Sequence, residues 1–140
     1  MIIDVAGNHP KISVEEIQYA TEFFAKELMP RAWDRLYIDI NMSWLKGLHG
    51  EMVRISRYEY GIELSKKIGY KTAISTLAHE MVHVRQMFRG ELTQVGSKDR
   101  WNGKTYPEAY DYFNCPWEIE AYGREIGLTH KYLCHLKNRA

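Results

Sequence analysis

Residues 72–88 read Thr-Ala-Ile-Ser-Thr-Leu-Ala-His-Glu-Met-Val-His-Val-Arg-Gln-Met-Phe, and the rest of the chain is interpreted around this stretch. Its apolar residues lie on nearly every face of a helix, which indicates a helix buried in a core. These residues are Ala73, Ile74, Leu77, Ala78, Met81, Val82, Val84 and Met87. His79 and His83 are four residues apart, so their imidazoles fall one turn apart on one helix face.

Two imidazoles at this spacing suit a zinc ion, which binds histidine nitrogen at about 2.0–2.1 Å. Glu80 directly follows His79 and projects beside such a metal rather than onto it. There its carboxylate can take a proton from a zinc-bound water, whose pKa the metal lowers. The alternative is that His79 and His83 are core residues whose nitrogens are satisfied by ordinary hydrogen bonds.

A catalytic zinc ion usually has three protein ligands and one open position, so a third ligand is expected elsewhere in the chain. An extended motif with a third histidine is excluded, because that position holds Arg89 and Gln86 replaces the glycine that would bend the chain. The third ligand is therefore expected to come from a second helix.

Residues 114–122, Asn-Cys-Pro-Trp-Glu-Ile-Glu-Ala-Tyr, begin such a helix. Asn114 or Cys115 can cap it, and Pro116 suits its first turn. Glu118 and Glu120 point about 200° apart on a helix, so only one of them can face the metal. Both could instead belong to a solvated, acidic helix start.

The His79-Glu80-x-x-His83 motif and the later sequence of residues 116–122 together resemble the gluzincin class of zinc metallopeptidases. The similarity covers roughly residues 71–127 and is greatest to small single-domain members from phages and bacteria, the SprT-like and minigluzincin-type domains. The resemblance implies a Zn²⁺ cofactor held by His79, His83 and Glu120, with Glu80 as general base and acid. Glu120 is chosen because a small residue, Ala121, follows it, as in that class. The implied substrate is a peptide or protein.

The expected fold is one α+β, zincin-like domain over residues 1–140. It contains an N-terminal helix, a small twisted mixed sheet, the zinc-binding helix and the following glutamate helix. Ser13 has the capping-box spacing at the start of the first helix, which ends before Pro30. Alternating apolar residues predict strands over residues 35–42 and 50–60 and a short third strand over 61–64. Residues 90–114 are expected to form a loop rimming the cleft, with a tight turn at Asn102-Gly103.

A second hydrogen-bond donor would stabilise the oxyanion that forms during hydrolysis. The candidates are the tyrosines near the second helix, Tyr106, Tyr110, Tyr112 and Tyr122. Tyr110 and Tyr112 are preferred because Tyr122 cannot share the face of Glu120, although each could equally be a packing residue. Arg124 does share that face and could pair with Glu120. His130 and His135 are expected to be surface residues of a polar tail.

The composition of the chain disfavours some classes of binding partner and location. The net charge is +1 and the Lys and Arg residues are scattered, which disfavours nucleic acid. No apolar stretch is long enough for a membrane span, and the start of the chain has no signal-peptide pattern, so a cytoplasmic location is expected, that of the host if a phage encodes the protein. Two cysteines suggest free thiols rather than a disulfide framework.

Two alternative functions, neither of them enzymatic, remain open. The chain could be a zinc-stabilised binding or regulatory module without catalytic activity, whose metal site is closed by Asp111 or Glu118. Glu80 argues against this module, because a structural site has no use for a carboxylate beside the water position. The second alternative is a metal-free helical domain with coincidental histidines.

Overall fold

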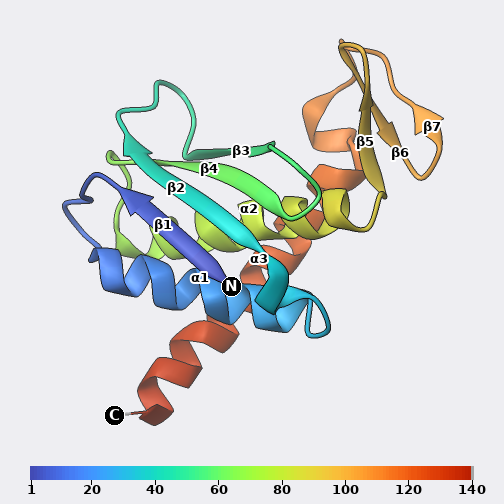
Figure 1. The fold of residues 1–140 in the computed structure, drawn as a ribbon. Coiled ribbons are helices and arrows are strands. Elements are labelled where there is room, and N and C mark those ends of the chain that lie inside the picture. The colour runs from blue at the N-terminus through green and yellow to red at the C-terminus, as the bar shows by residue number, and fades with distance from the viewer. Residues whose placement is uncertain (140) are drawn as a thin grey trace.

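The computed structural model describes residues 1–139, which form three α-helices and two β-sheets (Figure 1). In chain order the elements are β1 (Ile2–Ala6), α1 (Val14–Leu28), η1 (Trp33–Arg35), β2 (Tyr37–Ser43), β3 (Gly50–Arg54), β4 (Glu59–Ser65), α2 (Tyr70–Phe88), β5 (Leu92–Val95), β6 (Lys98–Trp101), β7 (Lys104–Thr105), η2 (Tyr112–Asn114) and α3 (Pro116–Arg139). The expected mixture of helices and sheet is therefore confirmed. None of the helices in these residues has the length and apolarity that crossing a membrane requires.

The larger sheet has the strand order β1-β2-β4-β3. β1 and β4 run parallel to β2, whereas β3 pairs antiparallel with β4 and lies at one edge. The strand predicted over residues 50–60 is wrong as a single element, because a turn after Arg54 closes with Ile55 and Ser56 bonding the Glu59 carbonyl. The short strand predicted over 61–64 belongs to β4, and β1 is an additional strand.

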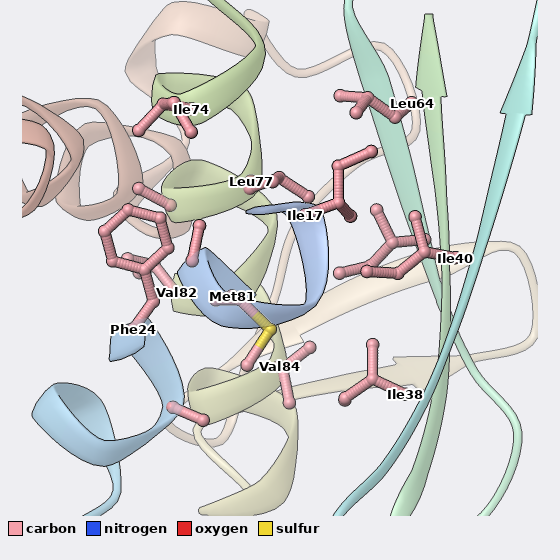
Figure 2. Close-up of a cluster of buried hydrophobic side chains, with 14 of the residues drawn as sticks. Ile17, Phe24, Ile38, Ile40, Leu64, Ile74, Leu77, Met81, Val82 and Val84 are labelled. Atoms are coloured by element: carbon pink, nitrogen blue, oxygen red, sulfur yellow. The ribbon is translucent and has the colours of Figure 1, made fainter. Parts of the chain in front are cut away.

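Helices α1 and α2 cover one face of this sheet (Figure 1). The Ser13 hydroxyl accepts a hydrogen bond from the Glu16 backbone N–H at 3.1 Å, as the capping-box spacing predicts. Figure 2 shows the core between the helices and the sheet, with Ile17 from α1, Ile40 from β2 and Leu77 from α2 pointing toward one another. Burial of these apolar side chains is the main favourable term that fixes α2 against the sheet.

Helix α3 packs along α2 and continues to Arg139. His130 and His135 lie in this helix rather than in a tail; His130 is exposed, as expected, whereas His135 is half-buried. His135 Nε2 lies 2.7 Å from the Tyr19 hydroxyl of α1, and its ring packs on Phe23 with centroids 5.0 Å apart. The C-terminal segment is therefore held by aromatic contacts to α1.

The segment between α2 and α3 is more ordered than the predicted loop, because it contains the three-stranded sheet β5-β6-β7. The predicted turn at Asn102-Gly103 is confirmed, with φ of 48° and 86° at the two residues. This small sheet projects beyond the end of α2 (Figure 1), and Trp101 packs on Trp117 with ring centroids 6.4 Å apart. Cys115 and Cys134 are free thiols, as expected.

Candidate metal centre

Helix α2 places His79 and Glu80 on the floor of a cleft, with His83 one helical turn further along. All three side chains are buried, with relative exposures of 6–7%. The cleft has a volume of about 320 Å³ and lies where α2, α3 and the segment before β3 meet. Its lining residues are Gly47, Leu48, His49, Gly50, Ser75, Thr76, His79, Glu80, Tyr112, Phe113, Tyr122 and Glu125. Two residues of the predicted motif, His79 and Glu80, therefore face this cleft.

Glu118, in the first turn of α3, bridges the two imidazoles. Its Oε1 lies 3.0 Å from His79 Nε2, and its Oε2 lies 3.2 Å from His83 Nε2. One ligand atom from each of the three residues lies within 4.8 Å of the others. His79 and His83 are thus brought together as predicted, with Glu118 as the carboxylate between them.

Glu120, the third ligand implied by resemblance, lies elsewhere. Its Oε1 accepts a hydrogen bond from Gln86 Nε2 at 2.9 Å, and its Oε2 lies 3.4 Å from Arg124 Nε. The reason is the buried face of α3, which includes Trp117, Glu118, Ala121, Thr129 and Tyr132. This face contains Glu118, so Glu120, two positions later, points away from the two imidazoles and meets α2 only through Gln86. In the structure the carboxylate between the two imidazoles is therefore Glu118, whereas the expected Glu120 contacts Gln86 and Arg124.

The second nitrogen of each imidazole also has a partner. His79 Nδ1 lies 2.9 Å from Glu125 Oε1, and His83 Nδ1 lies 2.8 Å from Gln86 Oε1. The Gln86 Nε2 group donates to the Trp117 carbonyl at 3.0 Å as well as to Glu120, so the amide oxygen must face His83. Both Nδ1 atoms are therefore hydrogen-bond donors, because each faces an acceptor oxygen.

With both Nδ1 atoms protonated, a neutral imidazole presents a lone pair at Nε2. Two such lone pairs then face the oxygens of Glu118, an arrangement of acceptors that only protons or a cation can satisfy. Burial opposes the charged form of His79, but hydrogen bonds to Glu118 and Glu125 outweigh this and raise its pKa to about 9. Burial likewise disfavours the ionised form of Glu118, yet hydrogen bonds from both histidines lower its pKa to about 2. The site therefore favours positive charge between these three side chains.

The donor set fits a zinc ion in composition and in spacing. Two imidazole nitrogens and one carboxylate are a common ligand set of catalytic zinc. Tetrahedral coordination with bonds of about 2.0–2.1 Å places neighbouring ligand atoms about 3.3 Å apart. The nitrogen–oxygen distances are 3.0 and 3.2 Å, each to a different oxygen of Glu118, and the three ligand atoms lie within 4.8 Å of one another. Contacts from Glu125 and Gln86 to the far ring nitrogens are the kind that orient histidine ligands in metal sites.

Glu80 lies on the same floor with its carboxylate uncommitted. Within residues 1–139 it has no hydrogen-bond partner, although its side chain lines the cleft. Burial raises the pKa of Glu80, whereas the nearby His83 and His79 act in the opposite direction. Strand β3 begins beside it, and a Cβ on Gly50 would lie 3.6 Å from Glu80 Cγ. Glu80 is thus positioned to exchange a proton with a molecule in the cleft.

Of the residues preferred as donors to the oxyanion or as support for the metal ligands, only Tyr112 lies at the site. The Tyr112 hydroxyl donates to Glu118 Oε1 at 3.1 Å and lies 3.3 Å from the Tyr122 hydroxyl. Burial and the bond to Tyr122 raise the pKa of Tyr112, so its hydroxyl stays protonated. Tyr110 instead packs on Tyr106, with ring centroids 4.9 Å apart. Arg124 does pair with Glu120, but that pair contacts neither imidazole.

Gln86 and Glu125 were not predicted as site residues, and Tyr122 was a candidate that was set aside because it cannot share the face of Glu120. The Tyr122 ring meets the His79 ring edge-on, with centroids 4.5 Å apart. Glu118, Tyr122 and Glu125 recur at helical spacing, so they share one face of α3. This spacing is visible in the sequence and could have placed these three residues on the face toward the histidines. Gln86 is three residues after His83 on α2, which places it on the same side as the histidine.

Comparisons with protein-family models, with curated proteins and with solved structures found no match to this chain.

Proposed function

We propose that this protein is a zinc-dependent peptidase in which His79, His83 and Glu118 hold the metal and Glu80 is the general base. One observation carries the proposal. Two imidazole nitrogens converge on a single carboxylate while their other nitrogens are already committed to Glu125 and Gln86. The uncommitted Glu80 beside this group is what distinguishes a hydrolytic centre from a purely structural one.

Each residue of the site would have a distinct role in hydrolysis. Glu80 takes a proton from water in the cleft and returns it to the leaving amine. Its buried position raises its pKa toward the operating pH, which suits both transfers. When bound, zinc polarises the scissile carbonyl and makes the attacking water more acidic. The protonated Tyr112 hydroxyl, which lies 3.1 Å from Glu118 Oε1, is proposed as the donor to the developing oxyanion.

A peptide is proposed as the substrate because an unpaired strand edge adjoins the cleft. β3 is the edge strand of its sheet, and Gly50 at its start lies against Thr76 and Glu80 of α2. An extended peptide can add to such an edge through main-chain hydrogen bonds, which tolerate many sequences. This contact would align a peptide bond with the floor of the cleft.

The test is hydrolysis of a quenched fluorescent peptide library by wild type, Glu80→Gln and a control, Glu15→Gln, each reconstituted with zinc. Glu15 is exposed on α1, away from the cleft and from β3, so its variant keeps the site. We expect zinc-dependent cleavage by wild type and by Glu15→Gln, and a loss of at least about 100-fold in Glu80→Gln. Equal zinc content with equal rates in wild type and Glu80→Gln would contradict the proposal.

A zinc-stabilised binding module is the alternative. A closed structural site has four protein ligands, but within residues 1–139 the converging group has three. Asp111 is used differently, because its carboxylate accepts hydrogen bonds from Phe113 N and Asn114 Nδ2 at 3.2 and 2.9 Å. Zinc binding without hydrolysis of any library peptide would favour the module.

A further inference from the structure

A second cleft, of about 480 Å³, lies at the far end of α2. The residues that line it are Arg54, Arg57, Met87, Phe88, Arg89, Gly90, Leu92, Thr93 and Gln94. Three of them are arginines and none is acidic. The cleft is therefore strongly basic, although the whole chain has a net charge of only +1.

Arg54, Arg57 and Arg89 are available for a ligand. All three are exposed, and no carboxylate within residues 1–139 forms a salt bridge with any of them. The Arg57 guanidinium lies 5.4 Å from the ring centroid of Tyr58 and 5.8 Å from that of Phe88. Stacking on aromatic rings holds a guanidinium in place and leaves its N–H groups free for hydrogen bonds.

Strand β3 connects this cleft to the candidate metal centre. The strand begins at Gly50, beside Glu80, and ends at Arg54, which lines the basic cleft. Four residues of extended chain separate these two ends, which corresponds to about 13 Å. A peptide lying along the free edge of β3 would therefore reach the arginines about four residues from the bond at Glu80.

The open face of the sheet has the opposite charge. A shallow cavity of about 610 Å³ there includes Asp4, Asp39, Glu51 and Glu63 in its lining and no Lys or Arg. Gln94 lines both this cavity and the basic cleft, so the two adjoin. A nucleic-acid backbone extending beyond the cleft would meet these carboxylates, whereas one or two acidic side chains would contact the arginines alone.

We propose that Arg54, Arg57 and Arg89 form a specificity subsite for an acidic side chain of an extended peptide, about four residues from the bond that is cleaved. This inference rests on the proposed peptidase function. Guanidinium groups bind carboxylates through paired, charge-assisted hydrogen bonds, which suits Asp or Glu at this position. The enzyme would then select substrates by charge, with main-chain contacts supplying the rest of the affinity.

The test uses binding rather than turnover. Zinc-loaded Glu80→Gln protein is titrated into fluorescein-labelled ten-residue peptides that carry either two Glu or two Gln four residues from the centre, and fluorescence anisotropy is measured. We expect the Glu peptide to bind at least about tenfold more tightly. Adding Arg57→Gln and Arg89→Gln should remove this preference, Arg57→Lys should keep part of it, and the exposed Arg31→Gln control should keep all of it.

Equal binding of the two peptides, or no binding of either, would overturn the proposed subsite. So would a preference for the Glu peptide that survives Arg57→Gln with Arg89→Gln in a folded protein. Tighter binding of oligothymidylate than of the Glu peptide would also overturn it. Circular dichroism melting shows that each variant is folded. Zinc-dependent hydrolysis by wild type without a Glu preference would leave the peptidase intact and reject the subsite alone. A Glu preference in a protein that hydrolyses nothing would reject the peptidase, and with it the assignment of this cleft as a substrate subsite.

Discussion

The side-chain amide oxygen of Gln86 lies 2.8 Å from Nδ1 of His83, which directs the other ring nitrogen of His83 toward Glu118. The orientation of the amide is set from its far end, where Nε2 donates to the Trp117 carbonyl and to Glu120. Gln86 is fully buried. One glutamine therefore couples a candidate metal ligand on α2 to the first turn of α3.

Gln86→Leu should weaken zinc binding by about 10–100-fold, because the His83 ring loses the acceptor that fixes its tautomer and orientation. Competition with a chromophoric zinc chelator measures the affinity. Gln94→Leu, on the exposed strand β5, is the matched control and should bind zinc as wild type does. Unchanged affinity in a folded Gln86→Leu protein would show that this contact does not orient the ligand.

Glu125→Ala should lower zinc affinity by a comparable factor, since Glu125 is the acceptor for His79 Nδ1 at 2.9 Å. Glu125→Gln should lose less, because an amide oxygen can still accept that hydrogen bond. The same chelator competition compares the two variants. An Ala variant that binds zinc as tightly as the Gln variant would contradict the role assigned to Glu125.

Gly50→Ala should destabilise the fold by about 1–3 kcal/mol and reduce peptide hydrolysis. A Cβ at this position would lie 2.5 Å from Thr76 Cγ2 and 3.1 Å from the Glu63 carbonyl oxygen, so β3 must move away from α2. Urea denaturation measures the loss. Thr76→Ala removes the obstructing methyl group, so combining it with Gly50→Ala should cost less than the sum of the two single changes.

Gly127→Ala is the control for that experiment. Gly127 lies inside α3, and a Cβ there would meet no atom within 4 Å. The change should stabilise the protein by about 0.5–1 kcal/mol through helix propensity. A Gly50→Ala protein as stable as wild type, or one that Thr76→Ala does not rescue, would show that the close approach of β3 and α2 is not strained by a side chain.

Tyr70→Phe should destabilise the protein near neutral pH, and the difference from wild type should shrink as pH rises from 10 to 12. Tyr70 and Tyr132 both donate to Glu16 Oε2, which ties α2 and α3 to α1. Burial and this hydrogen bond raise the pKa of Tyr70 to about 12. The folded state therefore keeps a proton that the unfolded chain loses above about pH 10, so this contribution is present below pH 10 and disappears by pH 12.

Urea unfolding of wild type and Tyr70→Phe at several pH values measures this dependence. Tyr58→Phe, whose hydroxyl accepts an exposed hydrogen bond from Arg35, is the comparison. A Tyr70→Phe difference that stays constant from pH 8 to pH 12 would show that the Glu16 contact does not hold the phenol in its protonated form.

The sequence predicted correctly those elements that depend on residue spacing and capping within a single segment. The helix that carries His79 and His83 and the Ser13 cap follow from residue spacing alone, and both are present. β1 was missed because Ile2–Ala6 does not alternate cleanly, and its structure depends on pairing with β2, more than thirty residues away. The polar strands β5 to β7 likewise depend on a distant contact, the packing of Trp101 on Trp117.

The expected position of Glu120 beside the histidines differs from the structure for the same reason. Glu118 and Glu120 are equivalent in their immediate surroundings, and a small residue after Glu120 was used to choose between them. The face of α3 is decided over its full length by residues as far along as Thr129 and Tyr132, which pack inward. Treating the end of the chain as a polar tail removed the part of the pattern that places Glu118 toward the histidines.

The central claim is tested most directly by the zinc content of purified wild type, Glu118→Gln and Glu120→Gln, measured by elemental mass spectrometry after reconstitution. The site geometry predicts about one zinc per chain in wild type and in Glu120→Gln, and little or none in Glu118→Gln. Loss of zinc from Glu120→Gln with retention in Glu118→Gln would contradict this site, and so would the absence of zinc from all three proteins.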